Sequence, residues 1–509
     1  MIARVLSAAI LGIDAYQVEV EVDIAPGLPA FSTVGLPEGA VKESKDRVKA
    51  ALKNSGYQYP ERKITVNLAP ADIKKEGSTF DLPIAIGILS ASGQTRADKL
   101  KEYFIIGELS LDGRVKPIRG TLPMALSARD EGKKGIILPL ENATEAAAVQ
   151  DIEVIGVKEL AEIVDFLGER VSLPPTIIDL NSIFAQPEDY QEDFNEVKGQ
   201  EHVKRALEIA AAGGHNIIMI GPPGSGKTML ARRLPSILPR MSLAEALETT
   251  KVHSVLGLLG NNHFLVTYRP FRSPHHTISD AGLIGGGSIP KPGEVSLSHN
   301  GVLFLDEFPE FKKNVLEVMR QPMEDGKVTI SRASMSLTFP AQFMLVAAMN
   351  PCPCGYFGDP QRQCLCTVPQ IHRYKSKISG PLLDRIDIHV EVPAVKYREL
   401  SDESMGEPSS TVRERVEKAR TVQNERFVGS RIYCNAQMGS RHLKKYCQIG
   451  DDSRRLLEMA ITKLGLSARA YSRILKVART IADLGWEQVI RSHHIAEAIQ
   501  YRTLDRHLE

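Results

Sequence analysis

The chain has 509 residues, which is too long for a single hydrophobic core and predicts about three domains. Hydrophobic residues make up 43% and charged residues 25%, a composition that is typical of soluble globular proteins and excludes a disordered chain. The 63 basic and 62 acidic side chains give a net charge of +1. This balance excludes attraction of the whole molecule to nucleic acid, so such binding would have to come from local basic patches.

The N-terminal segment MIARVLSAAILGIDAYQVEVEV contains a short apolar run that ends at Asp14. It has neither a cleavage-site pattern nor the roughly 18 apolar residues that a membrane span needs. We therefore expect a cytoplasmic protein with no membrane partner and with reduced cysteines.

Residues 1–170 are predicted to form a layered domain of the α+β or α/β class. Alternating or apolar runs predict strands, and helical spacing predicts a helix that ends at Gly56, with further helices beginning near Phe80 and Thr121. The predicted strands are 15–24, 62–68, 103–111 and 135–139, and the first helix is 37–56. The segment 171–193 contains prolines and an acidic end, and it is predicted to be a linker.

From residue 194 onward, apolar strands alternate with helices, which favours a parallel sheet covered on both faces. Residues 216–234 follow a strand–loop–helix pattern, and further buried strands are predicted at 301–308 and 341–350. This second domain is predicted to span 194–395. A linker with a connecting helix follows over 396–450, and 451–509 should form a lid of three helices.

A phosphate-binding pattern, G-x-x-x-x-G-K-[ST], lies between the strand and the helix of 216–234. Its residues are Gly221, Pro222, Pro223, Gly224, Ser225, Gly226, Lys227 and Thr228. The glycines let backbone N–H groups converge on phosphates at a helix N-terminus, where the dipole favours anions. Lys227 would neutralise the β and γ phosphates of ATP, and Thr228 would bind Mg²⁺. A chance glycine-rich turn is the weaker interpretation.

Polar residues also follow the next two apolar strands. Asp306 would hold the Mg²⁺ shell, and Glu307 is placed to polarise the attacking water. Asn350 can reach the same water and the γ-phosphate with its amide, although an Asn-Pro turn would also explain it.

Two arginines are candidates by position. Arg385 precedes a predicted strand at the edge of the module, so it could point into the nucleotide site of a neighbouring subunit and stabilise transition-state charge. Arg469 opens a helix of the lid and could touch the γ-phosphate from above. For either residue taken alone, a surface salt bridge would be the favoured interpretation.

Four of the six cysteines lie close together in the sequence: Cys352, Cys354, Cys364 and Cys366. In a reducing compartment such clustering favours metal ligation over disulfides. Four thiolates at C-x-C…C-x-C spacing could close a tetrahedral Zn²⁺ site and pin the loop after Asn350. Free thiols are the alternative, and a redox pair is less favoured because C-x-C is not the usual dithiol spacing.

The segments GPPGSGKT, GEVSLSHNGVLFLDEF, AAMNPCPCG, SGPLLDRIDIHVEVP and LSARAYSRILKVARTIADL occur in this order. Together they resemble the bacterial magnesium-chelatase-like AAA+ proteins of the YifB/ComM type across essentially the whole chain. The resemblance implies an α/β fold: a P-loop AAA+ module whose parallel sheet is sandwiched by helices, an N-terminal Lon-like domain similar to ribosomal S5 domain 2, and a C-terminal helical lid. It also implies a hexameric ring ATPase and, in ComM-type members, a helicase that promotes branch migration when transforming DNA is integrated.

The family pattern also implies roles for individual residues. Lys227 and Thr228 would form the P-loop site, and Asp306 and Glu307 the Walker B pair. The remaining roles would be sensor 1 for Asn350, the trans-acting finger for Arg385 and sensor 2 for Arg469.

Segments 74–91 and 107–132 are similar to the Lon protease domain, in which a serine and a lysine form the catalytic dyad. Here the lysine position falls on Leu122, so neither Ser78 nor Thr79 has a matching base. We therefore expect a non-proteolytic scaffold or DNA-guiding domain.

If the ring moves along DNA, basic loops should line its pore and contact phosphates without reading bases. One candidate is a nonhelical, glycine-rich loop, and the other is a hairpin over 326–340. Their candidate DNA contacts are Arg269, Arg272, His275, His276, Lys291, Lys327 and Arg332. The competing functions are the ATPase subunit of a true magnesium chelatase, an AAA+ remodeller of protein complexes, and a Lon-type protease.

Overall fold

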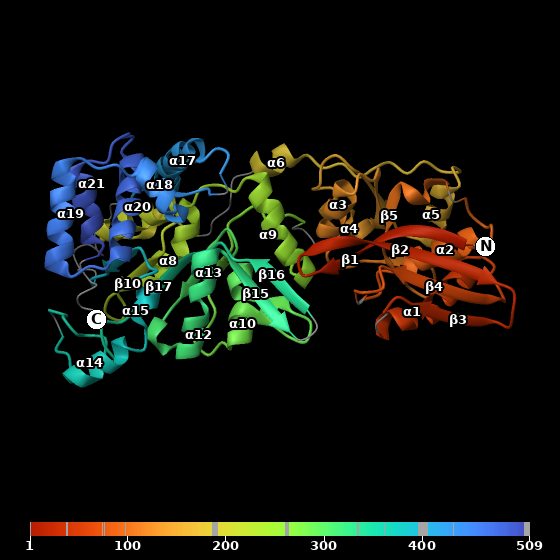
Figure 1. Cartoon of the computed structure of the whole chain (residues 1–509), viewed down its shortest axis with the longest axis horizontal. Helices are drawn as coiled ribbons and strands as arrows, with labels where there is room; N and C mark the ends of the chain where they lie inside the picture. The colour runs from red at the N-terminus through yellow and green to blue at the C-terminus, as the bar shows by residue number, and fades with distance from the viewer. Residues whose placement is uncertain are drawn as a thin grey trace. The chain divides into compact units, whose positions relative to one another are not determined.

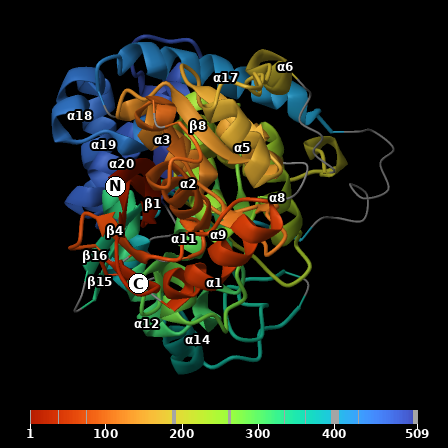
Figure 2. The same cartoon turned by 90° about the vertical axis from the view of Figure 1, so that its right-hand side faces the viewer.

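The computed structural model describes residues 2–36, 39–73, 75, 77–96, 98–185, 192–259, 264–332, 335–360, 362–394, 406–430 and 432–502. Residues 186–191 of the first predicted linker, 396–405 and 431 of the second, and 503–509 of the predicted lid lie outside these ranges. The chain forms two compact units (Figures 1 and 2). Unit 1 combines Met1–Pro187 with Leu243–Thr267, and unit 2 combines Glu188–Ser242 with Tyr268–Glu509.

The first sheet of unit 1 has the strand order β1-β2-β4-β3. Its strands are β1 (Ile2–Leu11), β2 (Asp14–Ala25), β3 (Ala30–Val34) and β4 (Lys63–Ala69). Strands β1, β2 and β4 are antiparallel neighbours, and β3 runs parallel to β4. The predicted strands 15–24 and 62–68 are confirmed, and the apolar run before Asp14 is itself a strand. Helix α2 (Asp81–Ala91) is buried along its whole length and packs against β1 and β2, as expected for a helix that is apolar on every face.

A second, parallel sheet of unit 1 has the order β5-β8-β9. Its strands are β5 (Tyr103–Ile105), β8 (Gly135–Pro139) and β9 (Glu153–Val157). The strand predicted over 103–111 is interrupted, because the chain turns at Gly107 into a short hairpin of β6 (Glu108–Leu109) and β7 (Val115–Lys116). A side chain at Gly107 would place its Cβ 2.9 Å from Val115 Cγ1. The other helices of this part are α1 (Gly39–Asn54), α3 (Thr121–Asp130), α4 (Leu140–Ala146), α5 (Leu160–Leu167) and α6 (Leu180–Ala185).

Helix α9 (Leu243–Leu256) belongs to unit 1, although it lies inside the segment 194–395 that the sequence predicts to be one domain. Ser254 Oγ donates a 2.5 Å hydrogen bond to Glu145 Oε1, which also accepts the backbone N–H of Leu122 at 2.9 Å. Lys251 forms an ion pair with Asp14. The buried Ala246 and Val252 add apolar contact area. Packing against distant residues therefore decides where this helix belongs.

Unit 2 is built on a parallel sheet with the order β11-β14-β17-β10-β18. Its strands are β10 (Ile217–Ile220), β11 (Phe271–Arg272), β14 (Val302–Leu305), β17 (Met344–Met349) and β18 (Ile388–Glu391). Nearly every residue of the three central strands is fully buried, which suits a parallel sheet covered on both faces. The predicted parallel sheet is confirmed, and the carboxyl ends of its strands meet at one edge.

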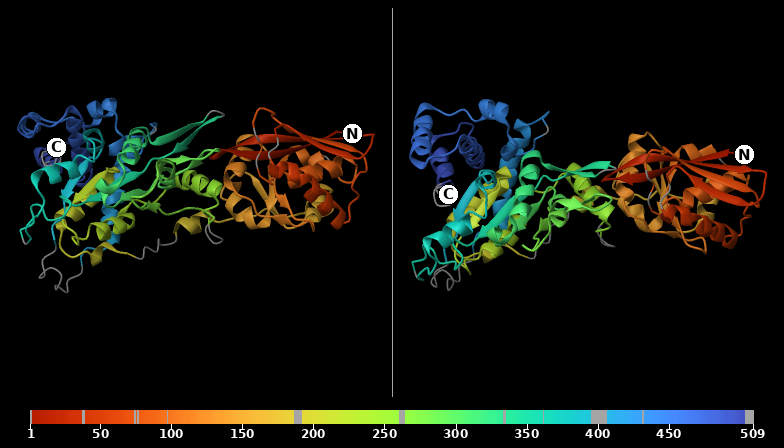
Figure 3. Two further views of the ribbon diagram at one scale, coloured as in Figure 1. Left: turned by 90° about the horizontal axis from the view of Figure 1, so that it is seen from below. Right: turned by 60° about the horizontal axis from the view of Figure 1, so that its bottom comes forward.

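Helices surround this sheet and form a bundle at one end of unit 2 (Figure 3). The three helices predicted at the C-terminus are confirmed as α19 (Asp451–Leu464), α20 (Ala468–Leu484) and α21 (Ser492–Gln500). The connecting helix is α17 (Ser409–Arg426). Other helices of unit 2 are α7 (Glu201–Gly213), α8 (Lys227–Arg233), α12 (Lys313–Val318), α13 (Arg320–Asp325), α14 (Val368–Lys375), α15 (Gly380–Leu383) and α18 (Ser440–Tyr446). No helix among the described residues is both long and apolar enough to cross a membrane.

Both inserts that carry the candidate DNA contacts contain regular structure. The predicted hairpin is confirmed as β15 (Lys327–Arg332) paired antiparallel with β16 (Met335–Pro340). The glycine-rich insert is not the nonhelical loop that its composition suggested. It contains α10 (Asp280–Ile284) and α11 (Glu294–Leu297), with β12 (Gly285–Gly286) paired to β13 (Lys291–Pro292) between them.

Candidate nucleotide site and cysteine cluster

The loop after β10 is held close to the sheet edge. The Gly221 N–H donates to Met349 O at 3.2 Å, and a Cβ at Gly221 would lie 2.1 Å from Val392 O, so only glycine fits there. Gly224 and Gly226 have φ values of +76° and +87°, which glycine adopts without the steric cost that other residues incur. The loop therefore curls tightly into the N-terminus of α8, the arrangement that binds phosphate in other proteins.

Lys227 begins α8, and its ammonium group lies beneath the loop. Its Nζ donates to Gly221 O at 2.8 Å and to Pro222 O at 2.9 Å, and it lies 3.3 Å from Asn350 Oδ1. Burial lowers the pKa of Lys227 below its usual value. The structure thus brings Lys227 and Asn350 together, and it places a cation where a triphosphate would be held.

Thr228 and Asp306 meet across the sheet edge. Thr228 Oγ1 donates a 2.7 Å hydrogen bond to Asp306 Oδ2, and Asp306 Oδ1 accepts the Glu307 N–H at 2.9 Å. Both oxygens belong to the types that Mg²⁺ prefers. Glu307 follows with φ +52°, a left-handed conformation that is uncommon outside glycine, and its side chain is exposed.

Sequence reasoning missed the partner of Glu307. His276 Nδ1 lies 3.2 Å from Glu307 Oε2, and the His276 ring packs at a tilt of 34° against that of His275, with the centroids 4.1 Å apart. His276 follows β11, which pairs with β14, so the two strands deliver the imidazole and the carboxylate to the same edge. The spacing of the residues does not predict this pair, because the sequence does not show that β11 lies next to β14 in the sheet.

Gln200 is a second residue that sequence reasoning missed. Its Nε2 donates to Ser225 O and to Pro393 O, each at 2.9 Å. It therefore ties the phosphate-binding loop to the chain that follows β18. Its backbone φ of +56° immediately before α7 directs the side chain into this position.

Neither Arg385 nor Arg469 has a hydrogen bond or ion pair with these groups among the described residues. The Arg385 side chain is only 7% exposed and donates to Glu324 Oε2 at 2.6 Å and to Pro381 O at 2.6 Å. This hydrogen bond from Arg385, together with the more distant charge of Arg469, lowers the pKa of Glu324. Arg385 is therefore occupied within its own subunit, and Arg469 is exposed in the first turn of α20.

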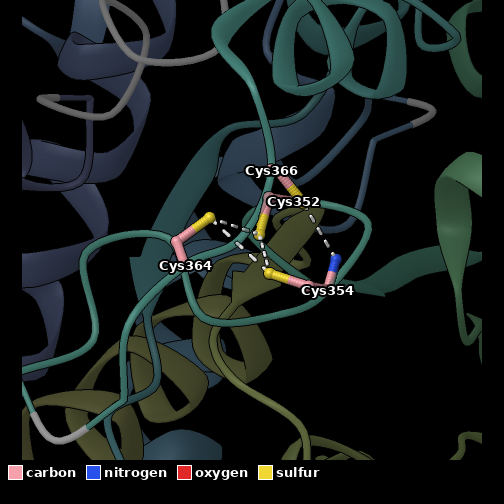
Figure 4. Close-up of side chains that lie close together, drawn as sticks. All are labelled: Cys352, Cys354, Cys364 and Cys366. Carbon is pink, nitrogen blue, oxygen red and sulfur yellow. Dashed lines mark hydrogen bonds between the residues drawn. The ribbon is translucent and has the colours of Figure 1, made fainter.

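Cys352, Cys354 and Cys364 face one another in Figure 4. Their sulfur atoms are separated by 3.3, 3.7 and 3.6 Å, and all four cysteine sulfurs lie within 4.8 Å of one another. Four thiolates around one Zn²⁺ at Zn–S distances of about 2.3 Å would be about 3.8 Å apart, so the cluster matches the size of such a site. Cys366 Sγ accepts the Cys354 N–H at 3.4 Å.

The cysteine cluster also favours a thiolate. Hydrogen bonds from the backbone N–H groups of Tyr356 and Leu365 lower the pKa of Cys354 to about 6. Desolvation and hydrogen bonds with the neighbouring thiols raise the pKa values of Cys364 and Cys366, so within the cluster the thiolate form, which binds metal, is favoured at Cys354. We call the segment 352–366 the cysteine knuckle.

The residues predicted to contact DNA differ in their accessibility. Arg269 donates to Pro239 O at 2.6 Å and to Asn300 O at 2.8 Å, and Arg272 forms a bidentate pair with Glu294 at 2.6 and 2.7 Å. These two arginines support the local fold. The exposed candidates are His275, Lys291, Lys327 and Arg332.

In unit 1, the position that would carry the Lon lysine is Leu122, which is fully buried. The Ser78 hydroxyl donates to Glu108. Ser78 thus pairs with the carboxylate of Glu108, and Leu122 cannot act as a base, so these positions form no serine–lysine dyad.

Family models described as magnesium chelatase, subunit ChlI, as subunit ChlI of Mg-chelatase, and as magnesium chelatase, subunit ChlI C-terminal match residues 193–400, 20–142 and 406–502 respectively. The chain is 47% identical over 512 residues to the competence protein ComM of Haemophilus influenzae, covering 100% of this chain and 99% of that protein. It is 45% identical over 503 residues to the YifB protein of Escherichia coli, covering 98% and 96%.

A shorter match is with the Lon protease 2 of Bacillus subtilis, with 33% identity over 136 residues, or 26% of this chain and 24% of that protein. The full-length relatives and the three family models together cover both units. Membership of this group supports an AAA+ ATPase. The chain belongs to the magnesium-chelatase-like family of ComM and YifB.

Proposed function

We propose that this protein is an ATP-hydrolysing AAA+ motor that acts on DNA as a hexameric ring. The observation that carries the proposal is the convergence of Lys227, Asn350, Thr228 and Asp306 at one edge of the parallel sheet. Full-length similarity to a protein named for competence supports a role in taking up or recombining DNA. In this role the motor is a helicase or branch-migration factor in natural transformation and homologous recombination.

The residues divide the chemistry of phosphoryl transfer among them. The loop Gly221–Thr228 binds the triphosphate, and Lys227 neutralises the β and γ phosphates. Thr228 and Asp306 would hold Mg²⁺, which supplies charge neutralisation when bound. Glu307 orients the attacking water, and Asn350 reports on the γ-phosphate.

Arg385 completes the site of a neighbouring subunit, and Arg469 contacts the nucleotide from the lid. For Arg385 to reach a neighbour, its pair with Glu324 has to open. Assembly of the ring would supply that change, because a triphosphate offers the guanidinium more negative charge than one carboxylate does.

The cysteine knuckle binds Zn²⁺ in this proposal. Four soft thiolate donors at the observed separations suit a closed structural site with no open position, and a metal there would hold an irregular segment that has little regular structure of its own. Metal analysis of protein purified without chelator tests the assignment. We expect about one zinc per chain, and a content near zero would refute it.

ATP hydrolysis measured with and without single-stranded or forked DNA tests the motor. We expect stimulation by DNA that disappears in Lys227→Ala. Stimulation only by a protein partner would instead favour a remodeller of protein complexes. Porphyrin-dependent turnover would favour a magnesium-chelatase subunit.

A further inference from the structure

The cysteine knuckle touches the nucleotide site at two places. Its first cysteine, Cys352, is fully buried and lies two residues after Asn350, whose Oδ1 is 3.3 Å from Lys227 Nζ. The chain then turns back, with the Gly355 N–H donating to Cys352 O at 3.0 Å. The turn therefore starts from the strand that carries the proposed phosphate sensor.

The second contact is with the phosphate-binding loop itself. Gly355 is buried and has φ +87°. A Cβ at this position would lie 2.4 Å from Pro223 Cδ and 2.6 Å from Pro223 Cγ. The backbone of the knuckle thus packs directly against the second proline of the loop, with no room for a side chain between them.

The chain that follows the knuckle also contacts the sensor strand. Helix α14 follows the last cysteine, and its buried Tyr374 has a hydrogen bond with the backbone of Asn350. Burial raises the pKa of Tyr374, so its hydroxyl stays protonated. The segment before the cluster and the helix after it are both fixed to Asn350.

We propose that the cysteine knuckle positions the phosphate-binding loop, and that metal held by its four thiolates sets the affinity of the loop for nucleotide triphosphate through the Gly355–Pro223 contact. This inference rests on the proposed nucleotide and zinc sites. The loop contains two glycines with positive φ, Gly224 and Gly226, which leave it free to adopt other conformations. The backbone at Gly355 packs against Pro223 and restricts that freedom. In this proposal the backbone keeps its position only while the four cysteines are bound to one metal ion.

Two glycines of the knuckle give a matched test. Gly355 and Gly358 have φ values of +87° and +80°, but a Cβ at Gly358 meets nothing within 4 Å. Gly355→Ala and Gly358→Ala therefore introduce similar backbone strain, and only the first presses on Pro223. We expect Gly355→Ala to raise the Kd of a fluorescent ATP analogue about tenfold or more with zinc content unchanged, and Gly358→Ala to leave the Kd within about twofold.

A second pair of variants tests the contact if Gly355→Ala folds poorly. The Pro223→Ala variant lacks the pyrrolidine ring with which a Cβ at position 355 would clash. In that background, Gly355→Ala should therefore change the Kd much less than it does in the wild type. Equal effects in the two backgrounds would overturn the proposal, as would wild-type affinity in Gly355→Ala. Circular dichroism of each variant identifies loss of fold.

The metal is tested separately. Cys364→Ser should lower both zinc content and ATP affinity, and zinc-free protein that binds ATP as tightly as the loaded form would overturn the role of the metal. If wild-type protein purifies with no bound zinc, the proposed metal site is refuted. The Gly355→Ala and Gly358→Ala variants would still test the contact between Gly355 and Pro223. Failure of both wild type and Gly358→Ala to bind nucleotide would refute the proposed nucleotide site instead.

Discussion

The Nδ1 atom of His276 lies 3.2 Å from Oε2 of Glu307, so the carboxylate proposed to orient the attacking water has a partner from the neighbouring strand. His276 follows the edge strand β11, and Glu307 follows β14, which lies inside the sheet. The position of the carboxylate therefore depends on an insert that also carries exposed basic residues.

Glu307→Gln should keep ATP binding and stop turnover. The amide preserves the size of the side chain and leaves Asp306 and Thr228 in place, but it cannot accept a proton from water. We expect kcat to fall by about 10²-fold or more with the Kd for ATP unchanged. Equal loss of nucleotide binding, measured by fluorescence titration, would contradict this role.

His276→Ala should reduce kcat by roughly tenfold without changing ATP affinity, because Glu307 loses the group that positions it. His275→Ala is the control, since His275 packs against the His276 ring but has no hydrogen bond or ion pair with Glu307 among the described residues. If both variants lower kcat equally, the fall in kcat is due to loss of the contact between the two imidazole rings and not to loss of the pairing with Glu307.

Thr228→Val should weaken Mg²⁺-dependent nucleotide binding by about 10- to 100-fold. Valine has nearly the same shape as threonine but lacks the hydroxyl that donates to Asp306 at 2.7 Å. Thr228→Ser keeps that hydroxyl and should remain close to wild type. Titration with Mg²⁺ at a fixed ATP concentration distinguishes weaker binding of Mg²⁺ from weaker binding of ATP by the phosphate-binding loop. If Thr228→Val and Thr228→Ser bind nucleotide equally well, the hydroxyl has no role in Mg²⁺-dependent binding.

Arg385→Ala should abolish turnover while nucleotide still binds, and mixing it with Lys227→Ala subunits should restore part of the activity. Restoration requires that one subunit supply an arginine to the intact site of another. The comparison variant is Glu324→Gln, which weakens the internal pair at 2.6 Å and should leave turnover equal to or above wild type. Mixed rings without activity would contradict action across subunits.

ATP binding should take up a proton at alkaline pH. Burial lowers the pKa of Lys227 in the free protein, and bound phosphates favour the ammonium form and raise the pKa again. Between these two pKa values, affinity falls as the pH rises. In the protein without nucleotide, the unfolded chain binds more protons, so this lysine's contribution to stability rises with pH.

Calorimetry in two buffers of different ionisation enthalpy measures the proton uptake. Lys227→Arg is the control, because its guanidinium stays protonated. Proton uptake of the same size in this variant would assign the proton to another group.

Local patterns predicted which residues of the candidate nucleotide site lie close together. The loop Gly221–Thr228 and the acids at 306 and 307 follow apolar strands, and parallel strands bring their carboxyl ends to one edge, so proximity followed from the fold class. The hairpin over 326–340 followed from its alternation. These features depend on neighbours in sequence.

Features that depend on distant partners were not predictable in the same way. The pair of Arg385 with Glu324 joins residues 61 apart in the sequence, and the pair of His276 with Glu307 needs the strand order. Helix α9 has no distinct apolar face, and its buried residues include Thr249, Thr250 and Ser254, so its sequence pattern does not show which surface covers it. The break at Gly107 arises from packing against Val115, which the strand pattern of 103–111 does not contain.

Because Leu243–Thr267 packs with unit 1, the two halves of this protein cannot be separated by one cut. A fragment that starts at residue 188 would carry α9 without the residues that cover it, exposing Ala246 and Val252 to water and leaving Ser254 without Glu145. A fragment that stops at residue 187 would lack the same helix. Truncations intended to isolate the ATPase should therefore aggregate or lose stability unless residues 243–267 are replaced by a short polar connection.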